Sequence, residues 1–193
     1  MSNENNDKFT IKNEVQHYRW FKFKELLDWL RILVLSFCIV YLLNTFVIIN
    51  ANVPTGSMIP TVVPGEKIIA NRLAYVGDNS PQLGDVIIFR YPDNEEVLFT
   101  KRVIGVPGDE VIIKDGQVYV NGIKLVEPYV ATKAEGDFGP YEVPEGHYFV
   151  LGDNRNNSED SRYWNNTYVS EDEILGKVII KYGFNKPHIS KVQ

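Results

Sequence analysis

The sequence predicts a mainly β protein with one N-terminal transmembrane helix, followed by a β-rich domain of antiparallel sheets. Two observations predict this fold class. Residues 32–49 form an apolar run without a charged residue. The rest of the chain breaks into short runs rich in Val, Ile and Phe, bounded by Gly, Pro, Asp-Gly or Asn-Gly. We therefore divide the 193 residues into a cytoplasmic segment (1–29), a transmembrane anchor (30–50) and an extracytoplasmic domain (51–193).

The apolar run has the length and the flanks of a membrane anchor. With Trp29 and Leu30 it approaches the ~20 residues that a helix needs to cross a bilayer. The nearby Lys and Arg residues all precede it, and the next charged residue after Arg31 is Glu66. Because positive residues near a membrane helix stay on the cytoplasmic side, we expect the N-terminus there and the β-rich domain outside.

Two other interpretations of this run remain open. A buried core helix is one, although such a helix is seldom apolar on every face over this length. A cleavable signal peptide is the other. The leader of about 30 residues is longer than typical for one, and Ile49-Asn50-Ala51 is a poor small-x-small cleavage site. An uncleaved signal anchor is the favoured interpretation.

The strands follow in order after the anchor. Short apolar runs with β-branched residues predict them at 67–70, 85–90, 97–104, 111–113, 118–120, 148–151 and 177–180. Asp115-Gly116 and Asn121-Gly122 predict two tight hairpin turns. A short helical turn is expected near Ser170, where Glu173 completes a capping box. Residues 132–144 contain Gly and Pro and are expected to form a loop.

Composition excludes several classes of function. The formal net charge is −5, which disfavours nucleic acid as a partner. Cys38 is the single cysteine and lies in the anchor, so an intrachain disulfide, a cysteine-based metal site and a catalytic cysteine are excluded. We expect neither a metal nor a nucleotide cofactor, because the sequence has no phosphate-cradling glycine loop and no cluster of His and carboxylate ligands.

Three short blocks carry residues that suit catalysis. Residues 54–61 place Ser57 after a glycine in a proline-bounded turn, residues 101–109 place Lys101 in an apolar strand, and residues 152–162 form a dense polar loop. A serine hydroxyl needs a base to become a nucleophile. A lysine can serve when burial lowers its pKa and keeps it neutral. Each block alone would be an ordinary turn, a solvated strand lysine or a hydrogen-bonded loop. Together, behind an anchor, they predict a serine nucleophile and a lysine base.

The chain resembles the bacterial type I signal peptidases, or leader peptidases, in their compact single-anchor form typical of Gram-positive bacteria. The serine box of that family is matched by residues 54–61 and the lysine box by residues 101–109. The Gly-Asp-Asn-Arg box is matched by residues 152–162, and a further box by residues 84–89. The resemblance extends from the membrane segment nearly to the C-terminus and implies a catalytic domain of coiled antiparallel sheets.

The resemblance also implies roles for the matching residues. Ser57 attacks the scissile carbonyl, and Lys101 acts as general base and then as general acid. Ser158 orients the lysine amine through a hydrogen bond. The backbone N–H of Ser57 and the hydroxyl of Thr55 form the oxyanion hole. Near the site, Asp160 is expected to pair with Arg162, and Arg102 with Asp153 or another acid of the same loop.

The family's substrates are exported preproteins with small residues at positions −1 and −3 from the cut. An extended peptide would add as a strand beside the site, with alternate side chains entering shallow pockets. Our candidates for the pocket walls are Val53, Met58, Val62 and Thr100, each of which is equally compatible with ordinary packing. We also expect contact with the lipid bilayer, a place near the export translocon and a monomeric state.

Two rival functions remain open. A self-cleaving protein with the same Ser/Lys pair, such as the SOS-response repressors, is disfavoured by the membrane segment and by the absence of a helix-turn-helix pattern. A membrane-tethered β-rich module without activity is disfavoured because a scaffold needs neither Ser57 nor Lys101. Cleavage of a preprotein distinguishes all three.

Overall fold

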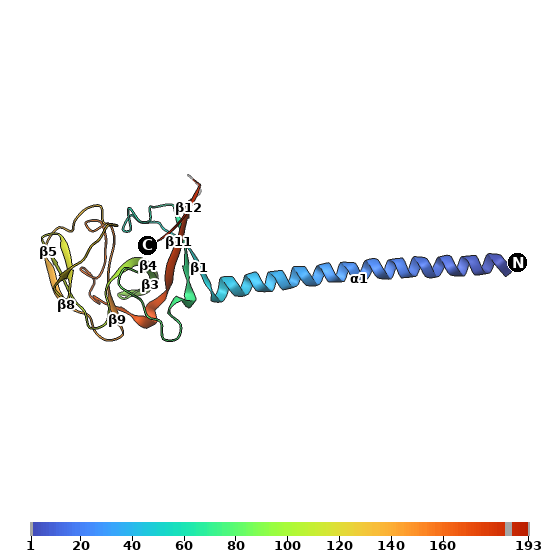
Figure 1. Cartoon of the computed structure of the whole chain (residues 1–193), viewed down its shortest axis with the longest axis horizontal. Coiled ribbons are helices and arrows are strands. Elements are labelled where there is room, and N and C mark those ends of the chain that lie inside the picture. The colour runs from blue at the N-terminus through green and yellow to red at the C-terminus, as the bar shows by residue number, and fades with distance from the viewer. Residues whose placement is uncertain (1, 184–186, 193) are drawn as a thin grey trace. The chain divides into compact units, whose positions relative to one another are not determined.

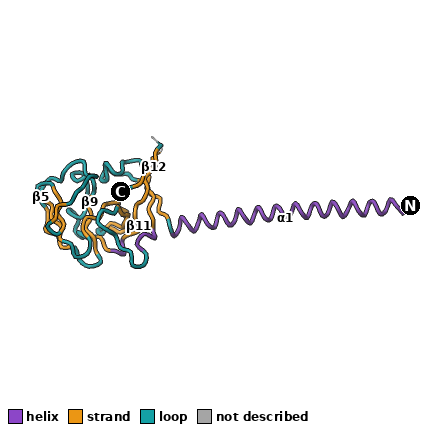
Figure 2. Tube along the Cα trace, viewed as in Figure 1, coloured by secondary structure: helices purple, strands orange, loops and turns teal. Residues whose placement is uncertain are grey.

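The computed structural model describes residues 2–183 and 187–192 and divides the chain into two compact units (Figure 1). The first unit ends at residue 45 and is a single long helix, whereas the second begins at residue 46 and contains every strand that the structure describes. Figure 2 shows the same division by element type, with mostly strands and loops in the second unit. The predicted mainly β fold class is confirmed.

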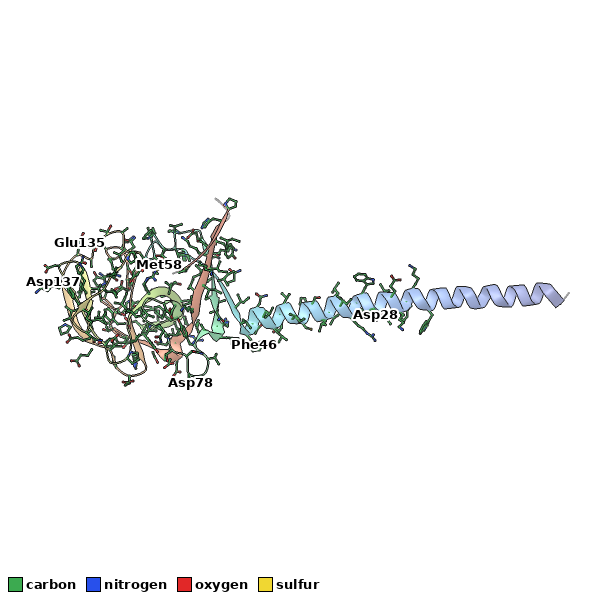
Figure 3. All side chains as sticks on the ribbon, in the orientation of Figure 1. Asp28, Phe46, Met58, Asp78, Glu135 and Asp137 are labelled. Atoms are coloured by element: carbon green, nitrogen blue, oxygen red, sulfur yellow. The ribbon has the colours of Figure 1, made fainter. Side chains whose placement is uncertain are left out.

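Helix α1 (Ser2–Phe46) contains most of the predicted membrane segment. Its part from Lys22 to Phe46 is 25 residues long and apolar enough to cross a membrane, and none of the apolar window is buried in the described structure. The large apolar side chains of this part are exposed and project from the helix, as Figure 3 shows for the stretch between the labelled Asp28 and Phe46. An exposed apolar surface on every side is typical of a helix solvated by lipid.

The C-terminal end of the predicted anchor is wrong by a few residues. We expected the segment to run to residue 50, but α1 ends at Phe46 and strand β1 (Ile48–Asn52) follows. Residues 47–49 are Val-Ile-Ile, and β-branched side chains fit a strand better than a helix. The antiparallel partner β2 (Lys67–Asn71) pairs with β1 over its whole length, with Ile49 opposite Ala70. The sequence could not show this partner, which lies some twenty residues further along the chain.

Antiparallel pairing organises the second unit into two sheets, and these comprise all strands within the described residues. The larger sheet has the strand order β1-β2-β11-β3-β4-β9-β10, and β12 pairs with β11 outside this path. The smaller sheet has the order β7-β6-β5-β8. The remaining strands of the larger sheet are β3 (Val86–Tyr91), β4 (Asn94–Gly105), β9 (His147–Leu151), β10 (Val169–Ser170), β11 (Ile174–Gly183) and β12 (His188–Lys191). The smaller sheet consists of β5 (Glu110–Lys114), β6 (Gln117–Val120), β7 (Ile123–Lys124) and β8 (Phe138–Glu142).

The smaller sheet confirms both predicted hairpin turns and corrects one loop. Asp115 and Asn121 have φ angles of 51° and 52°, and a glycine with positive φ follows each, as a tight hairpin requires. The predicted loop at 132–144, however, contains β8, which pairs with β5. Its Gly and Pro residues concealed the strand, while Phe138 and Tyr141 hold it by packing against the core of this sheet.

Two short 3₁₀ helices complete the unit. One, η1 (Arg72–Tyr75), follows β2, and the other, η2 (Glu171–Glu173), stands at the predicted helical turn. The Glu173 carboxylate accepts a hydrogen bond of 2.9 Å from the Ser170 N–H, which confirms the reciprocal half of the capping box.

The core lies in three apolar clusters, and the first supports the site. It joins Met58 and Val62, from the loop after β1, to Ile68 of β2 and Ile88 of β3. Figure 3 places Met58 among the densely packed side chains of the β-rich unit. Met58, the residue after Ser57, is 1% exposed, so its burial in the core holds the loop that contains Ser57. Such burial is worth about 2 kcal/mol for a side chain of this size.

Candidate active site

Ser57 lies in the loop between β1 and β2, which hydrogen bonds close into a compact turn. The Ile59 N–H donates to Gly56 O at 3.2 Å, and the Val62 N–H donates to Met58 O at 2.8 Å. The ends of the loop are joined where the Val53 N–H donates to Glu66 O at 3.0 Å. These hydrogen bonds fix the backbone around Ser57, and the Ser57 residue is 9% exposed.

Lys101 reaches this serine from strand β4. It lies opposite Ile87 of β3 in the centre of the larger sheet. Its side chain is buried, and its Nζ atom lies 2.8 Å from Ser57 Oγ. This hydrogen-bond distance joins a predicted nucleophile and a predicted base that are 44 residues apart in sequence.

Burial also gives Lys101 the protonation behaviour that a base needs. It lowers the pKa of the amine from 10.5 to about 8, because the charged form loses its hydration. The carboxylates of Asp160, Glu159 and Asp153 oppose this shift in that order, and the Arg162 guanidinium adds to it. A substantial fraction of the amine is therefore neutral at mildly alkaline pH.

Two buried ion pairs hold the loop at 152–162, and both join residues that we expected to pair. The Arg102 guanidinium donates two hydrogen bonds, of 2.8 and 2.7 Å, to the Asp153 carboxylate. The Arg162 guanidinium donates two, of 2.8 and 2.9 Å, to the Asp160 carboxylate. Asp153 also accepts a hydrogen bond from the Thr61 hydroxyl, so a single carboxylate connects the lysine strand, the serine loop and the polar loop.

Ser158 differs from its expected geometry. We predicted that its hydroxyl would hydrogen-bond the Lys101 amine, but Ser158 Oγ is buried and has no hydrogen-bond partner among the described residues. The amine is instead engaged with Ser57 Oγ. A buried hydroxyl without a partner is uncommon, and a catalytic role is one of the reasons for which such a group occurs.

Comparison with known proteins identifies the family of this chain. Residues 26–183 match the family described as "Signal peptidase, peptidase S26". The chain belongs to this family. "Probable signal peptidase I-2" of Synechocystis sp. is 39% identical over 145 residues, which cover 72% of this chain and 65% of that protein. "Signal peptidase I S" of Bacillus subtilis is 34% identical over 177 residues, covering 86% and 94%. "Signal peptidase IB" of Staphylococcus aureus is 35% identical over 177 residues, covering 82% and 90%.

The resemblance that the sequence motifs indicated is thereby confirmed at the level of the family. The chain spans slightly less than two thirds of the Synechocystis relative and nearly the whole length of the Bacillus and Staphylococcus relatives. The matched range, residues 26–183, encloses all four sequence boxes.

An apolar cleft of about 360 Å³ opens over the serine and lysine of this signal peptidase family member. Three of the four predicted wall residues, Val53, Met58 and Thr100, line it together with Thr55. Val62 is not among the lining residues. It is fully buried in the core cluster beneath, because the turn from Met58 to Val62 points its side chain inward.

Sequence reasoning missed several residues of the cleft. Leu98 and Phe99 come from β4, and Asn157 and Glu159 come from the polar loop. Strand alternation from Lys101 back to Phe99 could have indicated Phe99, since residues two apart share a face. Glu159 lies between two buried residues of its loop, and no sequence pattern indicated that it would line the cleft. Among the described residues, no group of His, Cys, Asp or Glu is arranged to hold a metal ion.

We expect Gly152→Ala to reduce cleavage by roughly 100-fold, because catalysis depends on placement within about 1 Å. A Cβ at this position would lie 2.1 Å from Ser158 Oγ and 2.6 Å from the Ser57 carbonyl oxygen. The serine loop or the polar loop must therefore shift. The measurement is the initial rate of cleavage. Glu145→Ala, at an exposed residue that does not line the cleft, is the control. Normal turnover by Gly152→Ala would show that the two loops tolerate separation.

Proposed function

We propose that this protein is a membrane-anchored serine endopeptidase that removes signal peptides from exported preproteins, cutting after small-x-small sites. The observation that carries the proposal is the 2.8 Å distance between Lys101 Nζ and Ser57 Oγ at the base of an apolar cleft. Membership of the signal peptidase family supports the choice of substrate class.

In the proposed reaction the neutral Lys101 amine accepts the proton of the Ser57 hydroxyl. The serine oxygen then attacks the scissile carbonyl carbon and forms a tetrahedral adduct. As the C–N bond breaks, the Lys101 ammonium returns a proton to the leaving amine, and an acyl-enzyme remains on Ser57. Water, deprotonated by the same amine, hydrolyses the ester and regenerates the serine.

Two further groups complete the proposed machinery. The Ser57 N–H and the Thr55 hydroxyl would donate to the developing oxyanion, and each such donor is worth ~3 kcal/mol. Ser158 would act when Lys101 is protonated, because an ammonium has additional N–H donors and the buried Ser158 oxygen has a free acceptor site. This accounts for a hydroxyl that is left unpartnered before the reaction begins.

The substrate backbone would bind between two strand edges. Within the described residues β1 is an edge strand of the larger sheet, and β9 begins to pair with β4 only at Arg102. Residues 97–101 of β4 therefore keep one edge open beside the cleft. An extended peptide can add to such an edge, and alternate side chains then point into the cleft. Met58 lines the cleft together with Ser57, and its bulk would favour small substrate side chains beside the serine.

The anchor and the charges around it support a proposed orientation. Positively charged residues precede the membrane segment, so residues 1–29 would lie in the cytoplasm and the β-rich unit on the extracytoplasmic face of the cell membrane. Preproteins emerge from the export translocon on that face, and the enzyme would act nearby as a monomer.

The proposed function is tested by incubating the full chain, solubilised in detergent, with a model preprotein. The position of the cut is read by mass spectrometry, and Ser57→Ala serves as the control. We expect a single cut after a small-x-small site with the wild type alone. Cleavage of this chain itself, without cleavage of the preprotein, would favour the self-processing rival. No cleavage of either would favour the inactive module.

We expect activity to rise with pH through about 8, because only the neutral Lys101 amine can act as the base. Glu159→Gln should move this rise in activity to lower pH, since the Glu159 carboxylate raises the pKa of the Lys101 amine. The measurement is kcat/KM from pH 6 to 10. Glu145→Gln, an exposed acid that does not line the cleft, is the matched control. A rate independent of pH over this range would contradict a lysine base.

A further inference from the structure

Asn154 is tied to the serine loop by two hydrogen bonds. Its side-chain Nδ2 donates to the carbonyl oxygen of Gly56 at 3.0 Å, across 98 residues of sequence. Its backbone N–H donates to the carbonyl oxygen of Ser57, also at 3.0 Å. The Asn154 backbone is in turn held where its carbonyl accepts the Asn157 N–H at 3.0 Å. One residue of the polar loop thus holds two consecutive carbonyls around the nucleophile.

The first of these hydrogen bonds determines the direction of a catalytic donor. The carbonyl of Gly56 and the N–H of Ser57 belong to the same peptide unit, which is planar, and in a trans unit the two groups point in opposite directions. A donor that holds the Gly56 oxygen therefore fixes where the Ser57 N–H points. That N–H is the backbone donor of the oxyanion hole under the function proposed above.

Glycine at position 56 makes such a restraint necessary. Without a Cβ its backbone rotates at little steric cost, so the peptide unit between Gly56 and Ser57 can turn more easily than at other residues. The Ile59 N–H also donates to the Gly56 oxygen, at the longer distance of 3.2 Å. Asn154 supplies the shorter of the two hydrogen bonds, and its backbone hydrogen bond holds the peptide unit on the other side of the Ser57 Cα.

We propose that Asn154 is a positioning residue that aims the Ser57 N–H at the oxyanion. Its effect is exerted through the Gly56–Ser57 peptide unit. Because the oxyanion forms only as the substrate reacts, the side chain contributes to kcat and little to substrate binding. Removing an oxyanion donor altogether lowers kcat by ~10²–10³-fold. A donor that remains but is less well aimed should lose part of this effect, roughly 10- to 100-fold.

The test compares Asn154→Ala and Asn154→Asp with wild type, using the full chain in detergent. Alanine removes the side-chain donor and keeps the backbone hydrogen bond to Ser57, whereas aspartate keeps the shape but can only accept. Asn156→Ala is the matched control, since Asn156 lies in the same loop but bonds Lys133 O and the Glu135 N–H instead. Rates are taken on the alkaline plateau, where Lys101 is neutral in every variant.

We expect both Asn154 variants to lose kcat 10- to 100-fold with KM changed less than about threefold. The affinity for a peptide aldehyde, which forms a tetrahedral oxyanion on the serine, should fall in parallel with kcat. The pH midpoint of Asn154→Ala should match the wild type. Unchanged kcat, a loss confined to KM, or an unaltered aldehyde affinity would overturn the inference while the wild type still cleaves. An inactive wild type would overturn the proposed function and this inference with it.

Discussion

Lys101→Met should abolish preprotein cleavage and at the same time make the protein more stable at neutral pH. Without the amine, no group beside Ser57 Oγ takes its proton, and the loss of kcat should be on the order of 10⁴-fold or more. The Lys101 amine also destabilises the folded state, because at pH 7 it is mostly protonated while buried. An apolar side chain of similar length removes this cost.

The sign follows from proton binding in the two states. The pKa of Lys101 is about 8 when folded and 10.5 when unfolded, so the unfolded chain binds more protons between these values. The destabilisation is fully present below pH 8, falls as pH rises, and is gone above pH 10.5. It is about 3 kcal/mol at most. The unfolding midpoint of Lys101→Met should therefore exceed that of the wild type at pH 7 by several degrees, and the two should converge at pH 10.5.

Ser57→Ala provides the matched control for this experiment. It should lose activity to the same extent, because the nucleophile and the base act as a unit, but it should not gain stability at pH 7 in the same way. Substantial turnover by Lys101→Met would refute the assignment of the base. An unfolding midpoint of Lys101→Met at pH 7 equal to or below that of the wild type would show that the buried amine does not destabilise the folded state.

Asp153→Ala should destabilise the β-rich unit by about 3–5 kcal/mol, the second large effect that we expect. The substitution leaves the Arg102 guanidinium buried without its carboxylate, and both side chains of this pair are almost fully inaccessible. The Thr61 hydroxyl loses its acceptor as well. Because the Asp153 carboxylate connects the lysine strand, the serine loop and the polar loop, activity should fall along with stability. Thermal unfolding of the detergent-solubilised chain measures the first effect.

The double variant Arg102→Met with Asp153→Leu tests the physical reason. If the cost comes from an uncompensated buried charge, removing both charges should recover part of the stability lost in Asp153→Ala. Asp172→Ala, at an exposed acid in η2, should change the unfolding free energy by less than about 0.5 kcal/mol. Equal losses in the single and the double variant would instead point to packing around Tyr129, over whose ring the guanidinium lies at 3.8 Å.

Local patterns were sufficient for much of the fold. The dipeptides Asp115-Gly116 and Asn121-Gly122 predict turns because positive φ angles are a property of the residues themselves. The strand around Lys101 was visible from its apolar neighbours. Two errors arose where pairing with distant residues overrides local preference. Residues 48–50 leave the predicted anchor because β2 offers them partners, and β8 forms from a stretch with Gly and Pro because β5 does.

The sequence by itself determined which residues are candidates for the site. Residue type, local order and hydropathy indicated a candidate nucleophile, a candidate base and a membrane helix, and the family resemblance indicated both ion pairs. Only the tertiary structure decided how they act. The 2.8 Å approach of Lys101 to Ser57, the burial that lowers its pKa, the unpartnered Ser158 and the hydrogen bonds of Asn154 all require elements far apart in the chain to meet. Burial and distance are properties of the packed chain as a whole, and a linear pattern contains neither.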